Sequence, residues 1–131
     1  MYFASGALAR KVEKLAMECW KPVGLSPSHA YLLLLVLDKP GVQPNHLSVQ
    51  LQLTPSTITR LIEKLEEKKL VTRTNEGKNT SVFPTEEAVE MLPLMKACRQ
   101  QFHDKQAIAM NNAACGELPG TMNRLSEELG K

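Results

Sequence analysis

The sequence predicts a mainly α-helical protein that carries one small β-hairpin. Through most of the chain, apolar residues recur at the three- and four-residue spacing of amphipathic helices, with Pro and Gly breaks between them. Residues 70–83 differ, because two β-prone runs there flank a polar segment that contains Asn and Gly. At 131 residues the chain can form one core of ordinary size, so we expect a single domain.

The first two helices are predicted from spacing and capping residues. In residues 5–20, apolar side chains recur at steps of four and three, and Pro22 then ends the pattern. Ser26 is an N-cap residue, and Pro27 stands at the first helical position, where its missing N–H costs nothing. The helix that follows ends near Asp38 and is apolar nearly all round, so we expect it to be the central core helix.

A short third helix and a fourth helix follow with almost no link between them. The third begins at Pro44, and the fourth begins after the N-cap Thr54, with Pro55 at its first position. The fourth helix is expected to reach Lys68, and its inward residues are Ile58, Leu61, Ile62 and Leu65. Two helices joined by so short a turn are typical of a helix-turn-helix.

The second half of the chain is expected to form the hairpin and two more helices. The hairpin strands are predicted at 70–74 and 80–83, around a polar turn at 75–79. Thr85 then caps a long helix that runs to about Asn112. A last short amphipathic helix carries Met122, Leu125 and Leu129.

The fourth helix has a polar face opposite its apolar stripe. This face carries Ser56, Thr57, Arg60 and Lys64. Hydroxyl groups followed by Arg and Lys suit a helix that enters the major groove of DNA. The hairpin would be a wing, in which Arg73, Lys78 and Asn79 could contact phosphate or the minor groove. The order helix, turn, helix, hairpin therefore indicates nucleic-acid binding.

Three stretches of the chain stand out together: GLSPSHAYLLLLVL, PNHLSVQLQLTPSTITRLIEKLEEKKLVTR and SVFPTEEAVEML. In these stretches the chain resembles the MarR (multiple antibiotic resistance regulator) family of winged-helix transcription factors, and residues 47–73 are the most specific part of the resemblance. It implies a winged helix-turn-helix with N- and C-terminal dimerisation helices. The single domain, 1–131, would then consist of a DNA-binding core at 26–85 and dimerisation helices at 1–22 and 86–131.

The resemblance also implies a function for these residues. It implies an obligate homodimer that binds a pseudo-palindromic operator in double-stranded DNA and releases it when an effector binds. We expect a repressor of transcription whose effector is a small phenolic or anionic molecule. By position, the residues that would face the operator are Ser56, Thr57, Thr59, Arg60 and Lys64. Glu76 and Lys78 replace the Asp-x-Arg pair usual in the family's wing, which predicts wing contacts with phosphate only. Lys69 replaces a glycine whose left-handed geometry should cost about 1 kcal/mol with a side chain.

Members of the family sense phenolic ligands, oxidants or zinc. Cys19 lies well after the place where the peroxide-sensing branch keeps its reactive cysteine, so its expected role is packing. The three histidines form no i, i+4 pair, and we expect no metal site. For a small effector, the candidates to line a crevice between the dimerisation helices and the winged domain are Met17, Trp20 and His29, although core packing explains them equally well.

Other classes of protein find less support in the sequence. No catalytic constellation and no glycine-rich phosphate loop stands out, so neither an enzyme nor a cofactor is expected. No apolar run approaches the roughly 20 residues that cross a bilayer, and no secretory segment opens the chain, so we expect a cytoplasmic protein. The alternative to DNA binding is a winged-helix protein-interaction module, because Glu63, Glu66 and Glu67 on the fourth helix would repel phosphate. Activation also remains an alternative to repression.

Overall fold

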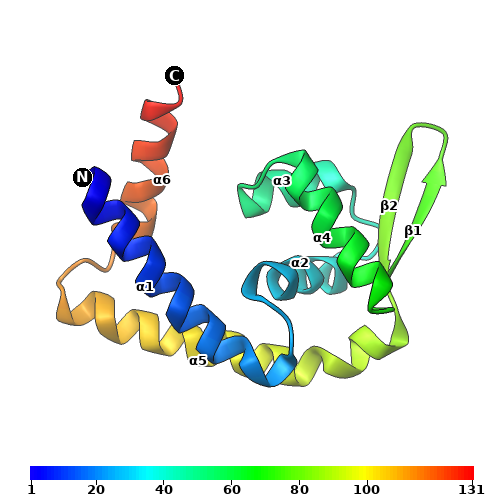
Figure 1. Ribbon diagram of the computed structural model, residues 1–131, viewed down its shortest axis with the longest axis horizontal. Helices are drawn as coiled ribbons and strands as arrows, with labels where there is room; N and C mark the ends of the chain where they lie inside the picture. The colour runs from blue at the N-terminus through cyan, green and yellow to red at the C-terminus, as the bar shows by residue number, and fades with distance from the viewer.

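The computed structural model describes all 131 residues and confirms a mainly α-helical fold with one antiparallel hairpin (Figure 1). The elements are α1 (Tyr2–Trp20), the 3-10 helix η1 (Lys21–Val23), α2 (Pro27–Asp38), α3 (Pro44–Leu51), α4 (Pro55–Glu67), β1 (Val71–Glu76), β2 (Asn79–Pro84), α5 (Glu86–Asn112) and α6 (Leu118–Leu129). None of the helices is both long enough and apolar enough to span a membrane.

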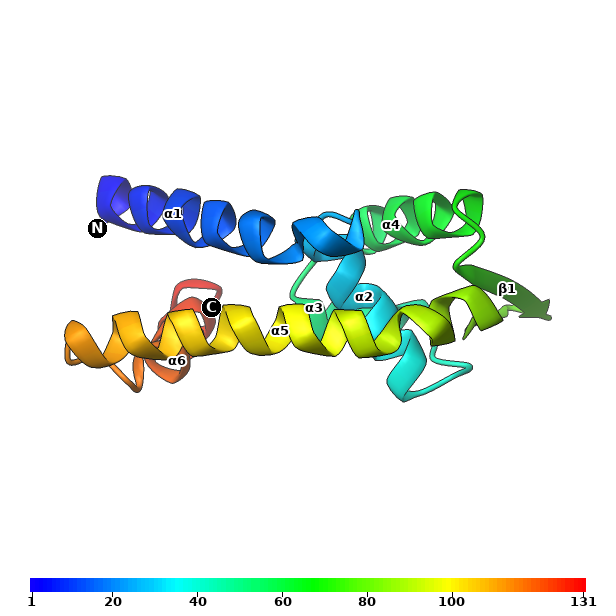
Figure 2. The ribbon, with the colours of Figure 1, turned by 90° about the horizontal axis from the view of Figure 1, so that it is seen from below.

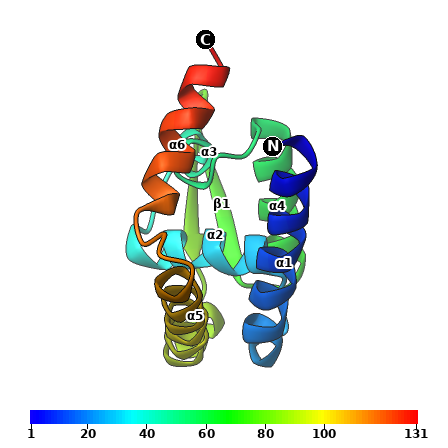
Figure 3. The same ribbon diagram turned by 90° about the vertical axis from the view of Figure 1, so that its left-hand side faces the viewer.

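The molecule has a compact part and an extended part. Helices α2, α3 and α4 gather with the hairpin over the first half of α5, and both chain termini lie at the opposite end of the molecule (Figure 1). Helix α1 meets the middle of α5 with its C-terminal end and diverges from it toward the N-terminus (Figure 1), and seen from below the two helices have nearly parallel axes (Figure 2). A view along α5 shows α2 crossing its direction (Figure 3). The compact part therefore holds the two helices of the predicted helix-turn-helix.

The core is centred on α2, as its nearly continuous apolar sequence predicts. Ala30, Leu32, Leu33, Leu34 and Val36 are all buried on this helix. They belong to one cluster of 20 buried residues, which also takes in residues of α1, α4, α5 and both strands. No polar or charged side chain is buried, so apolar contact alone fills the interior.

The predicted N-cap residues stand at the starts of their helices, and two of the three make the expected bond. Thr54 Oγ1 accepts a hydrogen bond from the N–H of Thr57, and Thr85 Oγ1 accepts one from Ala88. Ser26 makes no such bond, because its hydroxyl lies 2.5 Å from Nδ1 of His29 instead. The start of α2 therefore depends on Pro27 at the first helical position.

The hairpin turn is tighter than the sequence suggests. The prediction of a five-residue turn at 75–79 is wrong, because the strands pair from Val71 opposite Pro84 to Glu76 opposite Asn79. Only Gly77 and Lys78 remain in the turn, and Gly77 takes a φ of 62°. In two-residue hairpin turns a glycine at the first position supplies this positive φ without a steric cost.

A residue of the link between α2 and α3 pairs with the base of the wing, which the sequence did not predict. The N–H of Gly41 donates to the carbonyl of Val82 at 2.8 Å, and the N–H of Val82 donates to the carbonyl of Val42 at 3.0 Å. Both valines are buried. The base of the hairpin is therefore fixed to the core from a third segment.

The left-handed geometry expected at Lys69 is present, since its φ is 62°. We expect Lys69→Gly to raise the free energy of unfolding by about 0.5–1 kcal/mol, because glycine adopts this geometry without a Cβ penalty. Chemical denaturation at one fixed protein concentration measures the change. The control is Lys68→Gly, whose φ of −79° gives glycine no advantage, so it should lower stability. A loss of stability in both variants would contradict the prediction.

Candidate nucleic-acid interface

Helices α3 and α4 are separated by a turn of only three residues, 52–54. Gln52 closes α3 in the left-handed conformation with a φ of 55°, and its N–H bonds to the carbonyls of Ser48 and Val49. The hydroxyl of Ser48 donates to the carbonyl of Leu53 at 2.5 Å. These local bonds fix the exit of the chain from α3, and with it the direction in which α4 starts.

The two sides of α4 differ sharply in exposure. Ile58, Ile62 and Leu65 are completely or almost completely buried. On the opposite side Ser56, Arg60 and Lys64 are exposed, and Thr57 is half-buried. The polar face described from the sequence therefore lies at the protein surface, and the apolar face anchors the helix to the core.

A chain of hydroxyl contacts holds Arg60 over the first turn of α4. Thr57 Oγ1 lies 2.9 Å from Thr54 Oγ1 and accepts a hydrogen bond from Arg60 Nη2 at 3.3 Å. Ser56 Oγ lies 3.3 Å from Thr54 Oγ1. The guanidinium uses one of its five N–H donors here, so its other donors are available to a ligand. In contrast, the hydroxyl of Thr59 donates to the carbonyl of Pro55 at 3.0 Å and is thereby taken up by its own helix.

Two basic residues extend the polar face toward the end of α4. Lys64 lies 3.7 Å from Glu67, and both side chains are well exposed, so this ion pair contributes little and leaves Lys64 accessible. His29 of α2 stands close enough to Lys68 and Lys64 to feel their charges. Burial lowers the pKa of His29 below its ordinary value, and the two positive charges lower it further. His29 is therefore neutral at pH 7.

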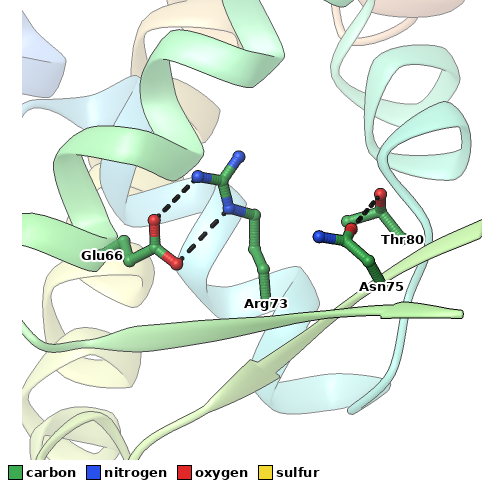
Figure 4. A network of polar contacts seen from close by, with 4 residues as sticks. All are labelled: Glu66, Arg73, Asn75 and Thr80. Atoms are coloured by element: carbon green, nitrogen blue, oxygen red, sulfur yellow. Dashed lines mark hydrogen bonds and ion pairs between the residues drawn. The ribbon is translucent and has the colours of Figure 1, made fainter.

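The wing residues differ in how they are engaged. Lys78 in the turn and Asn79 beside it are exposed. Arg73 is held by α4, since its Nη2 and Nε donate to the two carboxylate oxygens of Glu66 at 2.8 Å and 3.4 Å (Figure 4). Sequence reasoning did not find this pair, because seven residues and a change of element separate the partners.

The family model described as the MarR family matches residues 23–79, which include α2, the helix-turn-helix and most of the wing. Over these residues the chain is similar to the MarR family of transcriptional regulators. No curated protein matches the chain.

Solved structures of transcriptional regulators share the fold of this protein over nearly its whole length. A MarR-family regulator from Rhodococcus sp. RHA1 is 23% identical, with a TM-score of 0.75, and the alignment covers 94% of this chain and 89% of the other. MepR of S. aureus, solved in complex with DNA, is 13% identical, with a TM-score of 0.80 and coverages of 97% and 96%. CouR of Rhodococcus jostii RHA1, bound to a 23-mer DNA duplex, is 18% identical, with a TM-score of 0.79 and coverages of 96% and 92%. At these identities the likeness shows the fold.

The three residues predicted to line an effector crevice do not share one depression. Met17 is 55% exposed, in a shallow depression on α1 that is otherwise lined by charged side chains. Trp20 is fully buried, with its ring edge-on to Tyr31 at a centroid distance of 5.2 Å, and its indole N–H has no partner. His29 stands near the lysines of α4. The involvement of Met17, Trp20 and His29 in effector binding stays a prediction.

A depression that the sequence did not reveal lies between α2, α3 and α5. Its lining includes Tyr31, Leu34, Asp38, Leu51 and Arg99. Burial raises the pKa of Tyr31, so its hydroxyl stays protonated at pH 7 and can donate a hydrogen bond. Because these residues come from three helices, no sequence spacing could have brought them together.

The three cysteines of the chain are free thiols. Cys19 and Cys98 are buried, and Cys115 is half-buried. Burial raises the pKa of the Cys98 thiol, and the neighbouring Cys19 raises it further, which disfavours the reactive thiolate. No group of three or more His, Cys, Asp or Glu side chains is placed to hold a metal ion.

Proposed function

We propose that this protein is a dimeric, sequence-specific DNA-binding regulator that places α4 in the major groove and its wing on the adjacent backbone. One observation carries the proposal: Ser56, Arg60 and Lys64 are exposed along one side of a helix whose other side is buried. Hydroxyl groups and cations in this arrangement match the acceptors of phosphates and base edges. MepR and CouR, which share the fold, have been solved with DNA, and this supports the same use here.

A second copy of the chain is the partner that the extended part suits best. Exposed apolar side chains occur on α1 and α6, namely Tyr2, Phe3, Leu8, Val12, Met122, Leu125 and Leu129. Helix α6 buries no residue at all. Apolar surface of this extent marks an interface, and a two-fold dimer would set two copies of α4 on half-sites about 34 Å apart.

Repression, with release by a small effector, completes the proposal. The depression between α2, α3 and α5 adjoins the end of α3, which leads directly into α4. Arg99 supplies a cation and Tyr31 a hydroxyl there, which suits an anionic or phenolic molecule. CouR has been solved with p-coumaroyl-CoA, which supports an organic anion as the class of effector. Occupancy of this depression could shift α3 and α4 together.

A protein-interaction module is less well supported than DNA binding. Its basis is the acidic flank of Glu63, Glu66 and Glu67 on α4. However, Glu66 is paired with Arg73 and Glu67 with Lys64. Two of the three acids are thus offset by cations of the same surface, and their repulsion of phosphate is reduced.

Duplex binding at two salt concentrations tests the proposal. We expect the protein to bind a random-sequence DNA duplex at about 50 mM salt and to lose most of that affinity at about 200 mM, because binding releases condensed counterions. DNA from upstream of its own gene should bind more tightly if it contains half-sites one helical turn apart. No duplex binding at the lower salt concentration would exclude DNA recognition and leave the interaction module.

The wing lysine gives a more specific prediction. We expect Lys78→Ala to weaken binding to all duplex sequences by about the same factor, because an exposed lysine at the turn reaches phosphate and not base edges. The slope of log affinity against log salt should fall by about one unit. Titrations of one random and one upstream duplex over a salt series measure both effects. A loss confined to one sequence would show that Lys78 reads bases.

A further inference from the structure

The Glu66–Arg73 pair joins α4, the helix proposed to enter the major groove, to the wing. Arg73 Nη2 lies 2.8 Å from Glu66 Oε1, and Nε lies 3.4 Å from Oε2, so both carboxylate oxygens accept from one guanidinium (Figure 4). The side chains are 32% and 38% exposed. No other side-chain hydrogen bond or ion pair connects α4 with the hairpin. Paired bonds of this kind fix an angle as well as a distance.

A second polar contact lies farther along the same face of the wing. Asn75 follows Arg73 by two residues, so both side chains point to one side of β1, as Figure 4 shows. Thr80 stands directly opposite Asn75, and its hydroxyl donates to Asn75 Oδ1 at 2.9 Å. The polar side chains on this face are therefore bonded within the protein, the inner one to α4 and the outer one across the strands.

The wing needs such support, because little of it is buried. Val71 and Val82 near the base are buried, whereas all residues from 72 to 79 are exposed. A two-stranded hairpin without a packed face is only marginally stable in water. Arg73 stands opposite Val82, so the Glu66–Arg73 pair ties β1 to α4 at the level where the link between α2 and α3 holds β2, and the exposed part of the hairpin extends from this level.

We propose that Glu66 is a positioning residue for DNA binding, which acts through Arg73 to hold the wing where Lys78 meets the DNA backbone. The inference rests on the proposed function and deepens it. Arg73 thereby becomes a brace within the protein, in place of the DNA contact predicted from the sequence. Glu66 would then favour DNA binding through its contact with Arg73, although its own charge repels phosphate.

The brace and simple electrostatics make opposite predictions for the removal of this carboxylate. If Glu66 only repels phosphate, Glu66→Gln should tighten binding, and the released Arg73 would add a cation to the surface. If Glu66 holds the wing, the same substitution should weaken binding, because Lys78 is no longer held against the DNA backbone. The sign of the change in affinity therefore separates the two roles.

The experiment compares Glu66→Gln with Glu67→Gln on one random-sequence duplex over a salt series. The two variants remove the same charge from adjacent positions, but Glu67 is paired only with Lys64 of its own helix. We expect Glu66→Gln to bind about fivefold more weakly, with a salt slope lower by about one unit, as for Lys78→Ala. Glu67→Gln should bind as tightly as the wild type or slightly more tightly. The double variant Glu66→Gln with Lys78→Ala should bind no more weakly than Lys78→Ala alone.

A charge swap tests the pair directly. The double variant Glu66→Arg with Arg73→Glu keeps the net charge and can rebuild the ion pair, so we expect it to recover affinity that Glu66→Arg alone has lost. Since the pair is partly exposed, its loss should leave the thermal midpoint within a few degrees of the wild type, which circular dichroism checks. Equal or tighter binding by Glu66→Gln with an unchanged salt slope would show that Glu66 does not position the wing, and it would leave the proposed function intact. Failure of the wild-type protein to bind the duplex would overturn the proposed function itself.

Discussion

Replacement of Leu65 by alanine is expected to lower the free energy of unfolding by about 2–5 kcal/mol. Leu65 is completely buried in the core cluster, and its carbonyl accepts the N–H of Leu70, where the chain leaves α4 for the wing. Removal of three side-chain carbons forfeits their burial and leaves a cavity that a close-packed interior fills only in part. Because the apolar side of α4 is its attachment to the core, α4 would lose order first.

Chemical denaturation at one fixed protein concentration measures this effect, since a dimer's apparent stability depends on concentration. The control is Val49→Ala on the neighbouring helix α3. Val49 is 75% exposed, so its truncation should change the free energy of unfolding by no more than about 0.5 kcal/mol. Similar losses in both variants would mean that Leu65 does not belong to the packed core of the folded protein.

The helices could be predicted because their boundaries are encoded locally. Pro27, Pro44 and Pro55 each occupy the first position of a helix, where proline is favoured, and the structure starts α2, α3 and α4 at these residues. The apolar spacing of α4 likewise places Ile58 and Leu65 in the core. Such patterns depend on neighbours within a few residues, which a sequence displays directly.

The errors and omissions concern contacts between segments that are distant in the sequence. The turn of the hairpin was predicted too long, because the pairing of Asn75 with Thr80 depends on the register of two strands. The backbone bonds between Val42 and Val82 and the depression beside Arg99 also need the folded arrangement. No periodicity within one segment indicates these contacts.

The same distinction applies to the candidate site. Helical periodicity placed Arg60 and Lys64 on the outer face of α4, and the structure exposes both. Arg73 was assigned to DNA as a cation of the wing, but its partner Glu66 lies on another element. A charged residue's role depends on whether its own protein already engages it, which only tertiary structure reveals.

Replacement of Arg60 by alanine is expected to cost about 1–3 kcal/mol of binding free energy on a specific site and to relax the base preference at one position. Thr57 holds the guanidinium over the first turn of α4, at 3.3 Å from its hydroxyl, and the remaining donors can bind a base edge in pairs. Alanine leaves the acceptors of that base pair without a partner. The variant should therefore no longer distinguish among the four bases at that position of the DNA site.

Competition among single-base variants of a bound upstream duplex, at one salt concentration, measures this loss of base preference. Arg10→Ala is a matched control, because it removes the same charged group from α1 and leaves α4 intact. We expect Arg10→Ala to keep the full pattern of base preferences, whereas Arg60→Ala flattens it at one position in each half-site. If Arg60→Ala instead weakens every variant by the same factor, Arg60 contacts phosphate, and the specificity of the helix must come from its hydroxyl groups.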